Sequence, residues 1–444
     1  MDDSNVLNDK RGKRILLQMR GASLLLYIIA TNFYFGLLRI IAPVNKKASL
    51  YVNGRKKLLE NIEAQLMNDN REKCWFHCAS LGEFEQARPV MEAFKKQNPN
   101  LAIVLTFFSP SGYETRKHTP VADFVFYLPD DHAGNARRFI TAINPVAAVF
   151  TKYEFWYFYI NELRKRELPL VLISARFRKD QIFFKWYGNF FKRILQMFHF
   201  IFTQDENSVH LLRNYGIANS KKAGDTRFDR VIQTARTASA IDKLEAFKQH
   251  KLLLVAGSTY TAEEEILAYA MGKINAEMKI LIAPHEISEN RLLAIEKTFK
   301  DLVTQRYSTF DAGKPSNVLI MDNIGMLAAA YKSGDIALVG GGFGTKGMHN
   351  ILEPATFGVP VIYGPLNHDK FPEAKELIET GGGFKVTDKE SMLHLLNDFT
   401  ASADRRKSAG NLARSYIQNH QGATEVIMEL SLFKKLLTKV VSNS

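Results

Sequence analysis

The chain has 444 residues, of which 46% are hydrophobic and 24% are charged, a composition typical of folded domains that excludes a mainly disordered protein. Its formal net charge of +13 indicates an acidic partner, which could be nucleic acid, an anionic membrane or a phosphorylated substrate. The only two cysteines, Cys74 and Cys78, exclude a framework of several disulfides and favour a reducing compartment.

The N-terminal segment, residues 1–48, is first basic and then strongly apolar. No side chain from Gly21 to Leu38 is charged, a run slightly short of the roughly 20 residues that a membrane-spanning helix needs. Basic residues flank this run on both sides, so charge asymmetry does not assign a topology. We predict a membrane anchor or an interfacial helix, because aromatic and basic flanks suit a membrane surface. A buried helix and a cleaved signal peptide stay open as alternatives.

The rest of the chain alternates short apolar runs with helix-like segments, which predicts an α/β fold with parallel sheets. The predicted strands are Cys74–Cys78, Ala102–Phe107, Phe124–Leu128, Ala147–Phe150, Leu170–Ile173, Phe200–Thr203, Leu252–Ala256, Ile280–Ala283, Val318–Met321, Ile336–Val339 and Val361–Tyr363. We predict two Rossmann-like domains, 49–230 and 251–444, joined by a polar linker at 231–250. Small-molecule sites usually lie at domain interfaces and sheet switch points, so a central cleft between the domains is the expected active site.

Cys74 and Cys78 bracket His77 in a C-x-x-x-C spacing that could hold a metal. The segment also has the pattern of a strand, which puts both cysteines on one face and His77 on the other. Free cysteines are usually buried, so a structural role for both thiols is the favoured interpretation.

Two glutamates and one arginine of the first domain are candidates for catalysis. Glu83 lies in a glycine-containing turn after the first strand, which suits a general base, although the same position also favours a carboxylate through the helix dipole. Glu154 follows the fourth strand among aromatic residues, which suggests a raised pKa or a buried ion pair, while an interface cluster of aromatic residues is the alternative. Arg227 could clamp a carboxylate or phosphate, and the alternative is a surface salt bridge with Asp225 or Asp229.

The most informative segment of the second domain, Asp335 to Pro365, has the pattern strand, glycine loop, helix, strand. In an open α/β sheet such a loop, with Gly341 and Gly342, lies at the carboxyl end of a strand. Its free N–H groups and the next helix N-terminus can bind an anion there. Ser258, after another predicted strand, is a candidate phosphate contact and equally an expected helix cap.

Other classes of site find no support in the sequence. The segment 344–346 does not match a nucleoside-triphosphate loop, and His349 with Glu353 lacks the second histidine of a zinc-binding helix. No zinc-finger, RNA-recognition or helix-turn-helix pattern is present, so nucleic acid is not an expected partner. Neither a metal nor a cofactor is expected.

Five segments of the chain resemble the 3-deoxy-D-manno-oct-2-ulosonic acid (Kdo) transferases of lipopolysaccharide synthesis. They are HCASLGEFEQARPV, KYEFWYFYINEL, LISARF, GDTRFDR and GMHNILEPATFGVPVIYGP, and the resemblance extends from about Phe35 to the end of the chain. It implies the two-domain GT-B glycosyltransferase fold and inverting transfer of Kdo from CMP-Kdo to a phosphorylated lipid A precursor, lipid IVA. It also implies the cytoplasmic face of the bacterial inner membrane, with an anionic membrane surface as a further partner.

The resemblance also implies roles for individual residues. Glu83 matches the general base, and Glu154 and Arg227 match positions that stabilise the transition state, although the family usually has lysine where Arg227 stands. The segments that match the CMP-binding region contain Pro284, His285, Ile324, Gly325, Met326, Asn350, Ile351, Leu352 and Glu353. His285 stands where arginine is common and Met326 where glutamate is frequent, so contacts to base and ribose are expected to differ from the family pattern.

Two alternative functions stay open. Another GT-B sugar-nucleotide enzyme, such as a UDP-sugar transferase or an epimerase, would share the fold and bind a uridine nucleotide. A non-enzymatic basic protein would bind anionic lipid or RNA with a salt-sensitive affinity that does not depend on Glu83.

Overall fold

The computed structural model describes residues 3–274, 277–344, 347–366 and 371–430, with side chains from residue 21 onward. The chain forms two compact units. The first contains the described residues up to Thr226 together with those from Gly422, and the second is Arg227–Gln421.

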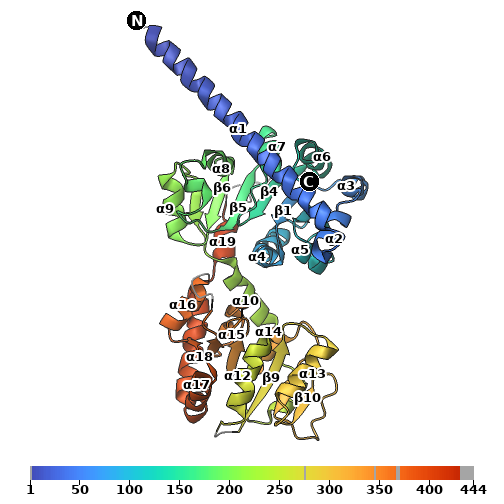
Figure 1. Cartoon of the computed structure of the whole chain (residues 1–444), viewed down its shortest axis with the longest axis vertical. Helices are drawn as coiled ribbons and strands as arrows, with labels where there is room; N and C mark the ends of the chain where they lie inside the picture. The colour runs from blue at the N-terminus through green and yellow to red at the C-terminus, as the bar shows by residue number, and fades with distance from the viewer. Residues whose placement is uncertain (1–2, 275–276, 345–346, 367–370, 431–444) are drawn as a thin grey trace. The chain divides into compact units, whose positions relative to one another are not determined.

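The first unit is a seven-stranded parallel sheet in the order β3-β2-β1-β4-β5-β6-β7, with helices on both faces (Figure 1). Its strands are β1 (Lys73–Cys78), β2 (Ala102–Phe107), β3 (Phe124–Tyr127), β4 (Pro145–Thr151), β5 (Leu170–Ala175), β6 (Phe200–Thr203) and β7 (Ser220–Lys222). Its helices are α1 (Asp3–Ile41), α2 (Lys46–Asn53), α3 (Leu58–Leu66), α4 (Leu81–Gln97), α5 (Pro110–Arg116), α6 (Ala133–Ile143), α7 (Tyr157–Lys165), the 3-10 helix η1 (Ile182–Phe184), α8 (Asn189–Leu195), α9 (Glu206–Asn214) and α19 (Ala423–Met428).

Strand β1 shows how the sequence builds this unit. All six of its residues are buried, as expected for a parallel sheet that is covered on both faces. Cys74, Phe76 and Cys78 contribute to one core cluster with α4 and α19, while Trp75 packs in another cluster with α3, α6 and α7. The prediction that both cysteines point to the same face of a strand is therefore confirmed, and both are buried in the core.

The second unit is also a seven-stranded parallel sheet, in the order β10-β11-β9-β8-β12-β13-β14. Its strands are β8 (Leu252–Thr259), β9 (Met278–Pro284), β10 (Thr304–Arg306), β11 (Val318–Ile320), β12 (Ile336–Val339), β13 (Val361–Tyr363) and β14 (Gly383–Lys385). Its helices are α10 (Thr226–Thr237), α11 (Asp242–Lys248), α12 (Thr261–Met271), α13 (Glu289–Thr298), α14 (Leu327–Ser333), α15 (Leu352–Thr356), α16 (Pro372–Glu379), α17 (Lys389–Ala401) and α18 (Ala403–Asn419). The predicted pair of Rossmann-like sheets is confirmed.

The structure differs from the predicted domain boundaries at two places. The predicted linker, 231–250, is largely helical, and Ile241, Leu244 and Phe247 join the core of the second unit. Near the C-terminal end, Ile427 and Met428 of α19 pack in the core of the first unit, so the second unit does not extend to the end of the chain. Both segments are short and contain few apolar residues, so the sequence does not indicate which core these residues pack against.

The C-terminal part of helix α1 runs along the first unit beside α2 and α7, while its N-terminal part extends away from the sheet (Figure 1). Within the described residues, Gly21–Ile41 is long and apolar enough to cross a membrane, with a mean hydropathy of 1.8. Its inner side is fixed to the body, because Phe35 is buried, Tyr27 donates a hydrogen bond to Asp131 and Arg39 pairs with Asp130. Its outer side carries the exposed apolar residues Leu25, Leu26, Ile29, Phe33, Leu37 and Ile40. The alternative of a buried helix is therefore wrong.

Candidate active site

The predicted site residues gather at two equivalent places, one in each sheet. Both sheets are doubly wound, and the strand order reverses between β1 and β4 in the first and between β8 and β12 in the second. Ligands of open α/β sheets bind at the carboxyl ends of strands beside such a reversal. Glu83 and Glu154 follow β1 and β4, while Ser258 and the glycine loop lie at the ends of β8 and β12.

Glu83 lies in the first turn of α4 and turns back toward the end of β1. Its Oε2 accepts a hydrogen bond from the N–H of Ala79, the residue that follows β1. Burial, together with the negative charge of Glu154, raises the pKa of Glu83 to about 8, against the opposing effects of the Ala79 amide and Lys152. The structure thus brings the two glutamates together, and Glu83 titrates in the range that suits a general base.

Glu154 is held by two donors from neighbouring elements. Its Oε2 accepts from Trp156 Nε1 at 2.6 Å and lies 3.1 Å from His77 Nε2. Its side chain is only 12% exposed. The orientation of this carboxylate is therefore set by the surrounding protein.

His77 belongs to a chain of hydrogen bonds that ends at Glu154. Thr106 Oγ1 lies 2.8 Å from both Trp75 Nε1 and His77 Nδ1. The indole N–H can only donate, so the Thr106 hydroxyl accepts from Trp75 and can pass its own proton toward Nδ1. The His77 Nε2–H then faces the carboxylate of Glu154. We did not predict this role for His77 from the sequence, although its position opposite the two cysteines was correct.

Arg227 is the first residue of the second unit. Its Nη1 forms an ion pair at 2.8 Å with Glu373 Oε1 on α16, and the Glu373 side chain is only 7% exposed. The sequence did not predict this partner. A nearly buried carboxylate needs a compensating cation, so Arg227 has a structural partner as well as its predicted catalytic role.

Three rings meet at the carboxyl edge of the second sheet. Tyr260, His285 and His349 follow β8, β9 and β12, and the ring centroids of His285 lie 5.0 Å from Tyr260 and 4.6 Å from His349. Tyr260 Oη is 3.1 Å from His349 Nε2. Burial and the neighbouring His285 lower the pKa of His349 to about 4, so this ring is neutral at pH 7. Of these three residues the sequence predicted only His285 as a ligand contact.

The glycine loop differs from its prediction in one respect. The N–H groups of Gly341 and Phe343 donate to Glu263 Oε1 at 2.9 and 3.3 Å, and Glu263 is 1% exposed. These two amides are therefore not free for an anionic ligand. The loop is instead shaped by close backbone packing, because a Cβ on Gly342 would lie 2.6 Å from the Gly364 nitrogen.

The remaining predicted donor residues fall into two groups. Ile351 and Leu352 are buried in the core, so they could contact a ligand only through their main chain. Beside them, Asn350 Nδ2 donates to Glu353 Oε1 at 3.1 Å, which orients both polar side chains together.

The second group lies at strand ends. Ser258 has a left-handed backbone with φ +55° near the end of β8, and Pro284 is the last residue of β9. In the loop after β11, Ile324 is 90% exposed, Gly325 has φ +96° and Met326 precedes α14. A left-handed backbone costs free energy for any residue except glycine, and such strain at a strand end is typical of ligand sites.

Among the described residues, no group of three or more His, Cys, Asp and Glu side chains could hold a metal ion.

Comparisons with known proteins agree with this arrangement. The profile of the family described as "3-Deoxy-D-manno-octulosonic-acid transferase (kdotransferase)" matches residues 53–230. The 3-deoxy-D-manno-octulosonic acid transferase of Aquifex aeolicus is 29% identical over 330 residues, which cover 73% of this chain and 85% of that protein. The transferase of the same name from Haemophilus influenzae is 28% identical over 374 residues and covers 80% of this chain and 86% of its own length.

The fold is shared more widely. The UDP-GlcNAc 2-epimerase from Neisseria meningitidis, solved bound to UDP-GlcNAc, covers 80% of this chain and 98% of its own with a TM-score of 0.56 at 15% identity. This likeness concerns the GT-B architecture alone, because it comes with little sequence identity. The chain is therefore a relative of the 3-deoxy-D-manno-octulosonic acid transferases, similar to them over most of its length, and it has the GT-B glycosyltransferase fold.

Proposed function

We propose that the chain transfers Kdo from CMP-Kdo to a phosphorylated lipid A precursor, with inversion at the anomeric carbon and with Glu83 as the general base. The observation that carries this proposal is the pair of electrostatically coupled glutamates at the switch point of the first sheet. A pKa near 8 lets Glu83 accept a proton near neutral pH, and Glu154 provides a second, fixed negative charge beside it.

The reaction assigns one step to each glutamate. Glu83 removes the proton from an acceptor hydroxyl as that oxygen attacks the anomeric carbon of Kdo, and the bond to the phosphate oxygen breaks so that CMP leaves. Positive charge develops on the sugar in the transition state, and Glu154 stabilises it. A single displacement inverts the anomeric configuration.

The second unit is proposed to bind CMP-Kdo. Tyr260, His285 and His349 form a group of neighbouring rings that suits stacking with a nucleobase, and the lowered pKa of His349 keeps that ring uncharged. Gly342 and the Asn350–Glu353 segment are the proposed contacts to phosphate and ribose, and Arg227 stabilises the leaving phosphate. The single phosphate of CMP is balanced in this proposal by these groups, and no step is assigned to a metal.

We further propose that α1 lies on the cytoplasmic surface of the inner membrane. The hydrogen bond of Tyr27 to Asp131 and the ion pair of Arg39 with Asp130 tie its inner side to the first unit, so a spanning orientation would carry these polar contacts into the bilayer. The outer apolar side is free to enter the interface. Arg164 and Arg193 line a neighbouring pocket of about 650 Å³ and suit anionic headgroups.

This membrane proposal predicts that Phe33→Glu combined with Leu37→Glu moves the protein from vesicles into the supernatant in a flotation assay with anionic liposomes. Both side chains are exposed, at 72% and 44%, so the fold should persist. Met67→Glu is the matched control, because Met67 is 75% exposed at the end of α3 and does not belong to α1. Equal flotation of all three proteins would contradict the proposal.

The test of the function is a detergent-supported assay with freshly generated CMP-Kdo and lipid IVA, read by mass spectrometry. Wild type should transfer Kdo, and Glu83→Gln should reduce the rate by roughly 10²- to 10⁴-fold while CMP binding persists. Glu92→Gln is the control on the same helix, since Glu92 pairs with Arg88. Full transfer by Glu83→Gln would show that Glu83 is not the general base. A folded wild-type protein that transfers no Kdo would favour a uridine-nucleotide enzyme or a lipid-binding protein.

A further inference from the structure

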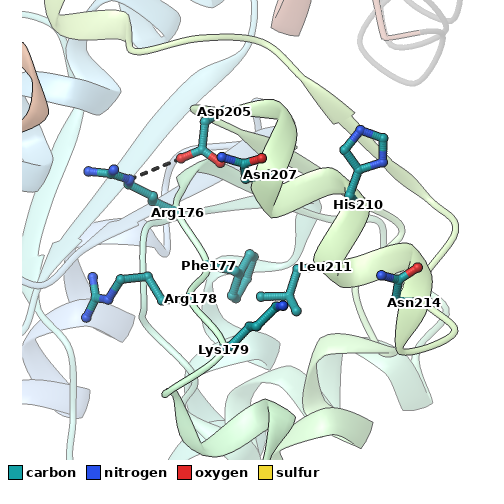
Figure 2. Close-up of a pocket in the computed structure, with 9 residues that line it drawn as sticks. All are labelled: Arg176, Phe177, Arg178, Lys179, Asp205, Asn207, His210, Leu211 and Asn214. Atoms are coloured by element: carbon teal, nitrogen blue, oxygen red, sulfur yellow. Dashed lines mark hydrogen bonds and ion pairs between the residues drawn. The ribbon is translucent and has the colours of Figure 1, made fainter. Parts of the chain in front are cut away.

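A separate pocket of about 430 Å³ lies in the first unit between the segments that follow β5 and β6 (Figure 2). It is lined by Arg176, Phe177, Arg178, Lys179, Asp205, Asn207, His210, Leu211 and Asn214. Phe177 and Leu211 are buried and form an apolar floor. Figure 2 shows the guanidinium groups of Arg176 and Arg178 on one side, and His210 with Asn214 on the other. None of these residues has a part in the reaction proposed above.

The charges of this pocket favour an anion. Three basic side chains, Arg176, Arg178 and Lys179, line the pocket, while Asp205 is the only carboxylate among the lining residues. The charge of Asp205 is already shared, because it accepts from Arg176 Nε at 3.0 Å and from the Ser208 N–H at 2.7 Å. Within the described part of the chain, Lys179 has no hydrogen bond or ion pair.

Arg178 is only weakly engaged. Its Nε lies 3.4 Å from Asp180, and both side chains are largely exposed, at 59% and 72%. Such a surface pair contributes little and yields readily to a stronger partner, such as a phosphate dianion bound by two cations. The pocket therefore holds two cations that a ligand can recruit without breaking a buried contact.

The pocket opens at the same edge of the sheet as the two glutamates. Strand β5 lies next to β4, which leads to Glu154, and β6 lies next to β5. Tyr153, beside Glu154, donates a hydrogen bond to the Arg176 carbonyl and so links the two loops. Neighbouring strands are roughly 5 Å apart, so the pocket is offset from β4 by roughly one or two strand spacings. This offset is comparable to one or two sugar rings.

We propose that this pocket binds a phosphate monoester on the sugar acceptor and thereby positions the acceptor hydroxyl at Glu83. This inference rests on the proposed function, because it assigns the place at which the acceptor is recognised. Two cations above an apolar floor, beside the Asn207 and Asn214 amides, fit a phosphorylated sugar better than a neutral one.

The test compares Arg178→Gln combined with Lys179→Gln against Arg213→Gln, an exposed charge on α9 that does not line the pocket. With a phosphorylated acceptor, the double variant should raise KM by about tenfold or more with little change in kcat. With the enzymatically dephosphorylated acceptor, the double variant and wild type should have equal KM. Arg213→Gln should behave as wild type with both acceptors.

Direct binding separates this proposal from the reaction itself. Calorimetry with a deacylated glucosamine disaccharide phosphate should show tenfold weaker binding to the double variant, even if wild type transfers no Kdo. If the double variant lost binding to anionic liposomes but still bound the disaccharide phosphate as wild type does, the pocket would be assigned to lipid headgroups and the proposal would be overturned. Equal KM changes with both acceptors, or no change at all, would overturn it as well.

Discussion

The switch point of the first sheet carries two neighbouring carboxylates, whereas that of the second carries aromatic rings and closely packed glycines. Glu83 and Glu154 influence each other electrostatically at the first edge. Tyr260, His285 and His349 surround the glycine loop at the second edge. The two sheets have the same number of parallel strands and the same kind of reversal. The reversal of strand order therefore determines where each site lies, while the segments that follow the strands determine which chemical groups it contains.

The two edges also differ in what fixes their shape. At the first edge, Gly82 has no atom within 4 Å of an added Cβ, so side chains and their hydrogen bonds determine the geometry. At the second edge, an added Cβ on Gly340 would overlap the Ser258 carbonyl oxygen. Backbone contacts therefore determine the geometry there, and the two edges should respond differently to substitution.

The largest expected effect is on the stability of the second edge. Gly340→Ala should lower the free energy of unfolding by about 1–3 kcal/mol, because the methyl group has no room against the Ser258 backbone. Urea unfolding would measure this loss. Gly344→Ala in the same loop and Gly82→Ala at the first edge are matched controls with open space around the new methyl group. If all three variants unfold at the same urea concentration, the contrast between the edges is wrong.

The next effect tests the electrostatics of the first edge. Glu154→Gln should lower kcat/KM by roughly 10²-fold, because a fixed charge beside the transition state is lost. The charge of Glu154 contributes to raising the pKa of Glu83 to about 8, so its removal should lower that pKa. The base acts only when ionised, so the wild-type rate should rise with pH through about 8 and the variant's rise should move to lower pH.

The pH profile of kcat/KM for wild type and Glu154→Gln checks this prediction. An acid limb that stays at the same pH in both proteins would mean that Glu154 does not influence the group that titrates. Glu162→Gln, on α7 and paired with Arg166, is a control carboxylate on a neighbouring element.

The smallest expected effect concerns the rings of the second edge. Tyr260→Leu should raise the donor KM by about tenfold, because loss of one stacking partner weakens binding of a nucleobase. Tyr260→Phe keeps the ring and loses only the hydroxyl near His349, so its donor KM should stay close to wild type. Steady-state kinetics with CMP-Kdo as the varied substrate separates the two variants. Equal donor KM values for the leucine and phenylalanine variants would contradict stacking.

Much of the fold could be predicted from the sequence, because buried parallel strands appear as continuous apolar runs. All eleven predicted strands are present within β1–β6, β8, β9, β11, β12 and β13 or overlap them closely. The three that were missed, β7, β10 and β14, are three-residue edge strands with polar residues, which lack an apolar run. The prediction of a linker at 231–250 was wrong for a related reason, because the burial of Leu244 and Phe247 depends on packing partners that are distant in the sequence.

The sequence by itself determined the two sheets, the apolar N-terminal helix and the strand ends at which Glu83, Glu154 and the glycine loop stand. These features depend on periodicity and on residues that are adjacent in the chain. Only the tertiary structure decided that Glu154 lies near Glu83, that His77 orients Glu154 and that Glu263 occupies the amides of the glycine loop. Hydrogen bonds and pKa shifts act over a few ångströms in space, and distance along the chain does not report that separation.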